Sequence, residues 1–281
     1  MTGKRYGCSW LHLVAVLLLA ACDSSEPGPP GMPDREVLTV LYESTGGSGW
    51  WRDRGWLTDD ELSTWDGVQT DEAGRVVGIA LGRNNLVGPI PHELGGLSNL
   101  EHLNLGANSL TGPIPAELGN LSSLEVLMLY DNPLTGQIPP ELGSLSNLAF
   151  LNLSNNSLQG PIPPELGSLS SAWILWLSNN SLTGPIPPEL GNLSSLEVLM
   201  LHDNPLTGQI PPELRSLSSL RSLLLSETSL AGPLPHELVG LDLTSFFWDD
   251  TNLCAPDDPA FLSWLGSIKY YRGGEICAMG G

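Results

Sequence analysis

Residues 173–196 read WILWLSNNSLTGPIPPELGNLSSL, and this 24-residue pattern organises most of the 281-residue chain. It recurs seven times without an insertion between Val77 and Thr244, and a partial eighth copy starts at Ser245. A fixed period of this length is typical of a solenoid, in which each repeat buries its apolar face only against its neighbours. The pattern therefore predicts one elongated repeat region over residues 77–253.

Leucines alternate with variable residues at the start of each copy, as Leu175 and Leu177 do. A period of two predicts a β-strand with one buried face, and stacked copies then form a parallel sheet. Each copy continues into a Gly-x-Ile-Pro segment, whose prolines lack the backbone donor that a helix needs. We therefore expect extended return segments with short 3₁₀ turns.

An asparagine stands at the turn after each strand, where its amide is expected to bridge backbone groups of neighbouring copies. Thr228 interrupts this column, which predicts a looser turn in the seventh copy. The column consists of Asn84, Asn108, Asn132, Asn156, Asn180 and Asn204.

The LTGPIPPELGNL half of the pattern resembles the plant-type, 24-residue class of the leucine-rich-repeat family, as found in bacterial secreted and lipoprotein members. The resemblance implies an α/β solenoid: a right-handed superhelix with a parallel β-sheet on its concave face, mostly 3₁₀ or extended returns, and short helical caps. It also implies a binding module.

The composition restricts the function further. Glycine (32) and proline (24) would suggest disorder if they were not periodic. With 31 acidic and 11 basic side chains and a net charge of −20, the chain has no basic stripe for nucleic acid. No nucleophile elbow, phosphate loop or zinc spacing is present, so we expect no enzymatic activity, no cofactor and no metal. The side chains of His202, Asp203, Glu227 and Asp250 could hold calcium, but a solvated acidic edge is the preferred interpretation.

The N-terminus has the pattern of a secretory signal over residues 1–21. Lys4 and Arg5 precede an apolar run that is too short to span a bilayer. The sequence Leu-Ala-Ala-Cys ending at Cys22 resembles a bacterial lipobox, which implies acylation of Cys22; the alternative is an ordinary secretory signal with a chance cysteine. Residues 22–33 are predicted to form a flexible tether. We expect a monomer, lipid-anchored to a membrane in the bacterial cell envelope, periplasmic or at the cell surface.

Both ends of the solenoid are expected to be capped. In residues 34–76, Asp34 is predicted to cap a short helix. Four tryptophans follow, which form either a lid over the core leucines, the preferred interpretation, or a carbohydrate platform; they are Trp50, Trp51, Trp56 and Trp65. In residues 254–281, Asp258 and Pro259 are predicted to open an amphipathic helix, bracketed by a disulfide between Cys254 and Cys277.

The outward strand positions between the leucines contain more apolar side chains than a solvated sheet face requires. We interpret them as a binding patch centred on Trp176; the alternative is that β-propensity alone fills these positions. The predicted contact residues are Val126, Met128, Tyr130, Phe150, Ile174, Trp176, Val198, Met200, His202, Leu224 and Trp248. Their predicted polar frame is Tyr130, Asp131, Ser154, Asn155, Ser178, Asn179, His202 and Asp203.

The preferred ligand is a protein or peptide, and a glycan is the second choice. Residues 125–148 and 197–220 differ at only three positions, so two similar surfaces could contact a repeating polymer, although duplication by slippage explains the identity without a ligand. The remaining alternative is a surface-adhesion, structural or ice-binding scaffold without a specific partner.

Overall fold

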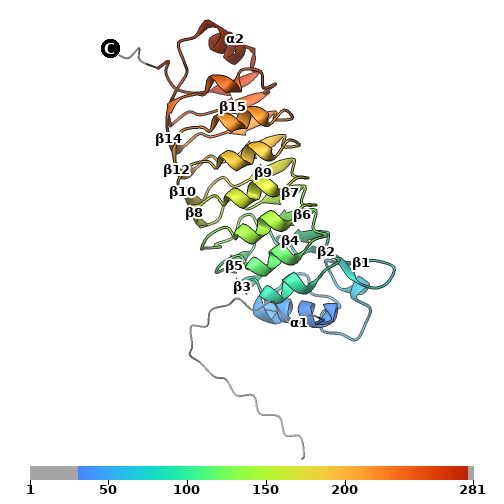
Figure 1. Ribbon diagram of the computed structural model, residues 1–281. Helices are drawn as coiled ribbons and strands as arrows, with labels where there is room; N and C mark the ends of the chain where they lie inside the picture. Colours follow the sequence, from blue (N-terminus) through green and yellow to red (C-terminus); the bar gives the residue numbers. More distant parts are fainter. Residues whose placement is uncertain (1–30, 278–281) are drawn as a thin grey trace, which may run out of the picture.

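The computed structural model describes residues 31–277 as one elongated solenoid, with the coils stacked in chain order (Figure 1). The main sheet has ten strands, and each coil adds one of them. Only the pairing of the first two strands is antiparallel. In sheet order the strands are β1 (Val68–Thr70), β2 (Val76–Ala80), β4 (His102–Asn104), β6 (Val126–Met128), β7 (Phe150–Asn152), β9 (Ile174–Trp176), β11 (Val198–Met200), β13 (Ser222–Leu224), β15 (Ser245–Phe247) and β17 (Tyr270–Arg272).

The returns are extended, with 3₁₀ turns, as predicted. Short parallel strands pair along the opposite side of the solenoid: β3 (Val87–Pro89), β5 (Ser109–Thr111), β8 (Gln159–Pro161), β10 (Ser181–Thr183), β12 (Asn204–Gly208), β14 (Thr228–Pro233) and β16 (Asn252–Cys254). The 3₁₀ turns are η1 (Gly47–Gly49), η2 (Leu62–Thr64), η3 (His92–Gly96), η4 (Ala116–Asn120), η5 (Pro140–Ser144), η6 (Pro164–Ser168), η7 (Pro188–Asn192), η8 (Pro212–Ser216) and η9 (His236–Leu238).

A continuous core runs through all coils, because the inward leucines of each strand lie beside those of the next. Leu175 and Leu177 are fully buried, as are their equivalents in neighbouring coils. Burying one such side chain contributes about 2 kcal/mol. The fold predicted from the repeat is therefore confirmed.

The asparagine column joins neighbouring coils, as predicted. The Asn132 side-chain oxygen accepts from the Leu110 N–H (3.0 Å), and its nitrogen donates to the carbonyls of Leu105 and Leu129 (both 3.1 Å). Thr228 keeps one such bond, from its hydroxyl to the Leu225 carbonyl (2.9 Å). The preceding residue, Glu227, keeps the left-handed φ of 54° that the equivalent residues have. The seventh turn is thus less bonded but has the same backbone shape.

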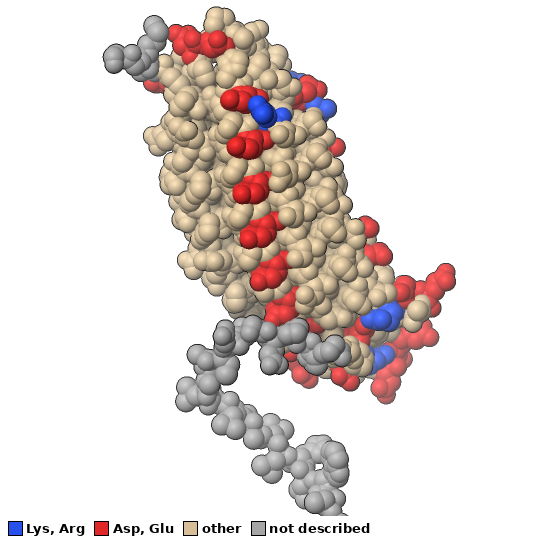
Figure 2. All heavy atoms as spheres, in the orientation of Figure 1, with Lys and Arg blue, Asp and Glu red and all other residues tan. Residues whose placement is uncertain are grey.

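Glycines in the return turns allow adjacent coils to approach each other. A Cβ atom on Gly167 would lie 2.3 Å from the carbonyl oxygen of Glu189 in the next coil and would overlap it. The same overlap would occur at the equivalent glycines of the other coils: Gly95, Gly119, Gly143 and Gly191. The column is broken at Arg215, which faces η9, a turn of three residues where η3 to η8 have five. The same row of turns bears a line of exposed or half-exposed glutamates along the solenoid, visible in Figure 2: Glu93, Glu117, Glu141, Glu165, Glu189, Glu213 and Glu237.

The N-terminal end is closed by α1 (Asp34–Ser44) and an aromatic cluster. Trp50, Trp56 and Trp65 are buried against one another and Tyr42, which fits a lid; Trp51 is 73% exposed. Buried rings cannot form a carbohydrate platform.

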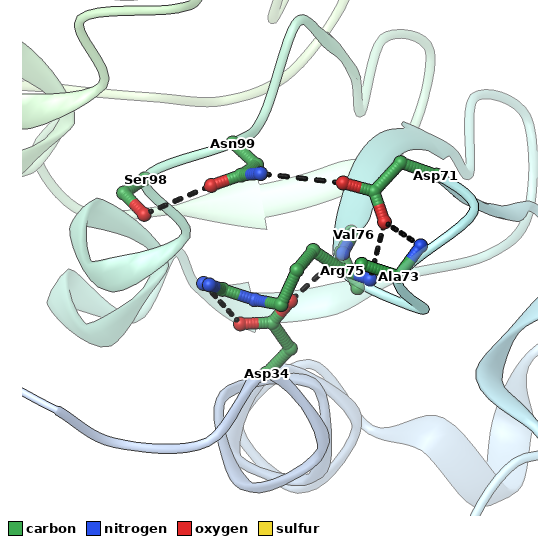
Figure 3. Close-up of polar contacts among 7 residues, drawn as sticks. All are labelled: Asp34, Asp71, Ala73, Arg75, Val76, Ser98 and Asn99. Atoms are coloured by element: carbon green, nitrogen blue, oxygen red, sulfur yellow. Dashed lines mark hydrogen bonds and ion pairs between the residues drawn. The ribbon is translucent and has the colours of Figure 1, made fainter.

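The prediction that Asp34 caps α1 is wrong. It is the first helical residue, and its carboxylate makes no cap bond. Instead it accepts two bonds of 3.0 Å from Arg75 and one of 2.7 Å from the Val76 N–H, which ties α1 to the first coil (Figure 3).

The C-terminal end is closed by α2 (Pro259–Ser267). Asp258 is its N-cap, accepting from the Phe261 N–H at 2.8 Å, as predicted. The predicted disulfide between Cys254 and Cys277 is present. Within residues 31–277, no helix is long and apolar enough to cross a membrane. The predicted signal, Cys22 and most of the tether lie outside the described residues.

Candidate functional site

The solvent-facing side of the main sheet, here called the concave face, bears most of the predicted contact residues. Backbone pairing places them in two rows across successive strands: Val126, Phe150, Ile174 and Val198 in one, and Met128, Trp176, Met200 and Leu224 in the other, where the buried Asn152 lies between Met128 and Trp176. The apolar members are half-buried. Because the inner strands are paired on both sides, a ligand on this face would contact side chains and no free strand edge.

Aromatic rings mark the centre of the face. The ring of Phe150 meets that of Trp176 edge to face, with centroids 5.2 Å apart. Trp173, 44% exposed, lies 6.5 Å from Phe150 and extends the cluster beyond the predicted set. The sequence carried a signal for this residue, since tryptophan replaces the glutamate found at this position in three other copies, as Glu101, Glu125 and Glu197.

The placement of Trp248 on the concave face is wrong. The seventh coil is one residue shorter than the others, so Ser222 pairs with Ser245 and Leu224 with Phe247. Adjacent strand residues point to opposite faces, and this shift turns Trp248 into the core, where it is 1% exposed. Phe247 takes the outward position, with the Arg272 guanidinium 5.9 Å from its ring. The seventh copy is therefore shortened, contrary to the uninterrupted period predicted.

Tyr130 and His202 are equivalent residues in the two similar copies, but their neighbours differ. The Tyr130 ring lies over Gly106, where a Cβ would overlap it. The equivalent neighbour of His202 is Ser178, which has a Cβ, so the smaller imidazole fits there. Burial lowers the pKa of His202 below its usual value, although Asp203 acts in the opposite direction.

Two polar atoms on this face are buried without a hydrogen-bond partner among the described residues. They are Trp176 Nε1 and His202 Nδ1. Most buried polar atoms in proteins have a partner, so both are unusual.

Parts of the predicted polar frame are not available to a ligand. Ser154 and Ser178 are buried, and the Ser154 N–H donates to Asn152 Oδ1 at 3.0 Å. Solvent reaches the other members of the frame: Tyr130 and His202, which are half-buried, and Asp131, Asn155, Asn179 and Asp203, which lie in the turns after the strands. Asn155 donates to Asp131 at 2.6 Å, so these turns are bonded to one another.

The acidic residues near His202 do not form a metal site. Among residues 31–277, no group of three or more His, Cys, Asp or Glu side chains is arranged to hold a metal ion. The adjacent Asp203 carboxylate, and after it the charges of Asp250 and Asp249, raise the pKa of Glu227. This arrangement is an edge of mutually repelling carboxylates.

The fold and the open face define a solenoid that presents side chains from a parallel sheet. The Leucine Rich Repeat family profile matches five consecutive segments, residues 99–121, 123–145, 147–169, 173–193 and 195–217. A search of curated protein sequences returned no match. The chain belongs to the leucine-rich-repeat family.

Solved structures show the same architecture. One is the leucine-rich-repeat ectodomain of the Arabidopsis receptor kinase HAESA in complex with an IDA peptide hormone. It is 31% identical to this chain, with a TM-score of 0.75, and the match covers 86% of this chain and 41% of the HAESA chain. A second is the ectodomain of GASSHO1/SCHENGEN3 from Arabidopsis thaliana in complex with Casparian strip integrity factor 2. It is 35% identical, with a TM-score of 0.68, and the match covers 84% of this chain and 32% of that chain. A plant ice-binding protein is 26% identical, with a TM-score of 0.62, and the match covers 88% of this chain and 98% of that chain. The chain thus spans about a third of the length of the first receptor ectodomains it matches.

Proposed function

We propose that this protein is an extracytoplasmic binding module that recognises a protein or peptide through its concave face, and that it has no catalytic role. The main support is the half-buried apolar surface around Trp176, because aromatic and methionine side chains within a polar frame are typical of interaction hot spots. Two similar ectodomains have peptide hormones or factors in their complexes.

A peptide-display library panned against the mature chain tests this proposal. Peptides selected by the wild-type protein should lose at least about tenfold in affinity for the Trp176→Ser, Met200→Ser double variant, the loss typical of hot-spot residues. The matched control is Trp51→Ser, which removes an exposed tryptophan from the N-terminal cap. Circular dichroism verifies that all variants fold. Equal binding by the double variant would refute the concave site.

We also propose that Cys22 anchors the protein by a lipid in the bacterial cell envelope. The lipobox-like residues before Cys22 and the composition of the tether support this, and the Cys254–Cys277 disulfide fits an oxidising compartment. Mass spectrometry of the mature N-terminus, compared with a Cys22→Ser variant, tests it. An unmodified residue 22 in membrane fractions would contradict it.

A scaffold that binds ice is the second candidate. It is supported by the similarity to the plant ice-binding protein and by a row of exposed threonines on the return side: Thr111, Thr135, Thr183 and Thr207. Gln159 interrupts this row. Thermal hysteresis that is lost on replacing Thr183 and Thr207 with leucine would favour this function over peptide binding.

A further inference from the structure

The concave face has an apolar centre that lies between two borders of acidic residues. We call the centre the apolar stripe, and it consists of Val126, Met128, Phe150, Ile174, Trp176, Val198, Met200, Leu224 and Phe247. Each of these residues is half-buried. The stripe crosses six strands from β6 to β15, a distance of about 24 Å at the usual strand spacing.

Acidic side chains flank the stripe at both ends of its strands. On one side, Glu125 and Glu197 directly precede β6 and β11, and both are exposed. On the other side, the turns after the strands carry Asp131, Asp203, Glu227 and Asp250, all at the same left-handed position with φ between 52° and 55°. Because this position is fixed by the turn, these side chains lie in one row along the stripe, in which Asn155 and Asn179 occupy the two positions between Asp131 and Asp203.

The chain supplies almost no counterions for these borders. Between Arg83 and Lys269 the only lysine or arginine residues are Arg215 and Arg221. Arg215 lies in η8 on the return side, in the same 3₁₀ turn as Glu213. Arg221 already pairs with Asp242 at 2.7 Å.

The carboxylates nearest Met200 and Leu224 repel one another. The neighbouring carboxylates of Asp203, Asp250 and Asp249 raise the pKa of Glu227, and Asp203 has the largest effect. Arg272 compensates only Asp249, at 3.4 Å. A cation placed beside this border would therefore be attracted strongly, because each added positive charge meets several negative ones.

We infer that the partner of the concave face is a cationic peptide segment, whose apolar side chains contact the apolar stripe and whose lysine or arginine side chains contact the acidic borders. This inference rests on the proposed peptide-binding function and adds the chemical class of the ligand. An extended segment of about seven residues spans the stripe, at about 3.4 Å per residue. Neither a nucleic acid nor an anionic lipid surface is compatible with acidic borders.

The test uses three sets of extended nine-residue peptides with identical apolar positions. Their polar positions carry lysine and arginine, glutamine, or glutamate. Binding to the full mature chain is measured by fluorescence polarisation at low and high salt. The expected result is at least tenfold tighter binding of the cationic set than of the glutamine set, with the difference decreasing as salt rises.

Two isosteric double variants locate the effect. Asp203→Asn with Glu227→Gln should remove most of the preference for the cationic set. Glu141→Gln with Glu213→Gln removes the same charge from the return side and should leave the preference unchanged. An equal loss in both variants would mean that only net charge matters, which overturns the inference.

The remaining outcomes separate the inference from the proposed function. If the glutamine set binds as tightly as the cationic set and the Trp176→Ser, Met200→Ser variant abolishes binding, the inference fails and the proposed function stands. If no set binds, or if cationic peptides bind that double variant as well as they bind the wild type, both fail.

Discussion

The asparagine column allows a quantitative prediction, because two of its members have the same bonds but different neighbours. Asn204 accepts from the Leu182 N–H (3.0 Å) and donates to the carbonyls of Leu177 and Leu201 (both 3.0 Å). Asn180 accepts from the Leu158 N–H (3.0 Å) and donates to the carbonyls of Leu153 (3.0 Å) and Leu177 (3.1 Å).

The two alanine variants leave different numbers of buried groups without a partner. In Asn180→Ala the Leu153 carbonyl still accepts from Asn156, and the Leu177 carbonyl still accepts from Asn204. Only the Leu158 N–H is therefore left without a partner. In Asn204→Ala the Leu182 N–H is orphaned and so is the Leu201 carbonyl, because Thr228 stands where the next asparagine would donate.

Each orphaned buried group costs about 1–3 kcal/mol. We therefore expect Asn180→Ala to lower the free energy of unfolding by about 1–3 kcal/mol and Asn204→Ala by about 2–6 kcal/mol. Asn204 is also the more deeply buried, at 2% exposed, so water cannot replace its bonds as easily.

Urea denaturation followed by circular dichroism measures both costs, and hydrogen exchange at the Leu158 and Leu182 amides localises them. Thr228→Asn supplies the missing donor, so in that background the cost of Asn204→Ala should decrease to that of Asn180→Ala. An equal or larger cost for Asn180→Ala in the wild-type background would refute the reasoning, as would an unchanged cost of Asn204→Ala in the Thr228→Asn background.

Three further predictions concern other contacts. Gly143→Arg should lower the free energy of unfolding by about 2 kcal/mol or more, because a Cβ at this position would overlap the Glu165 carbonyl. Arg215→Ala should change it by only about 0.5 kcal/mol. Equal effects of the two variants in denaturation experiments would contradict this. Asp34→Ala should lower the free energy of unfolding by about 2–3 kcal/mol, because it leaves the buried Val76 N–H without a partner. If Arg75→Ala lowers it by the same amount, the loss comes from the ion pair and the reasoning is wrong. Because the pKa of folded His202 is lowered, the unfolded chain takes up its proton first, so stability should fall as pH decreases through 6.5; His202→Gln should reduce this slope, and an unchanged slope would exclude His202 as its source.

The local pattern of the sequence was sufficient to predict the solenoid. The 24-residue period, the alternating leucines and the proline-containing returns are repeated in every copy, and each copy contacts only its neighbours. Local regularity therefore carries over directly into the tertiary arrangement. The disulfide and the Asp258 cap were predictable for a similar reason, since each lies within one short segment of the chain.

The composition of the binding surface was decided by the tertiary structure wherever the regularity is broken. One missing residue in the seventh coil buries Trp248 and exposes Phe247, because strand residues alternate between faces. Asp34 binds Arg75, 41 positions away in the sequence, a contact that no local pattern indicates. The sequence determined that an apolar stripe crosses the sheet; packing between coils determined which side chains a ligand can reach.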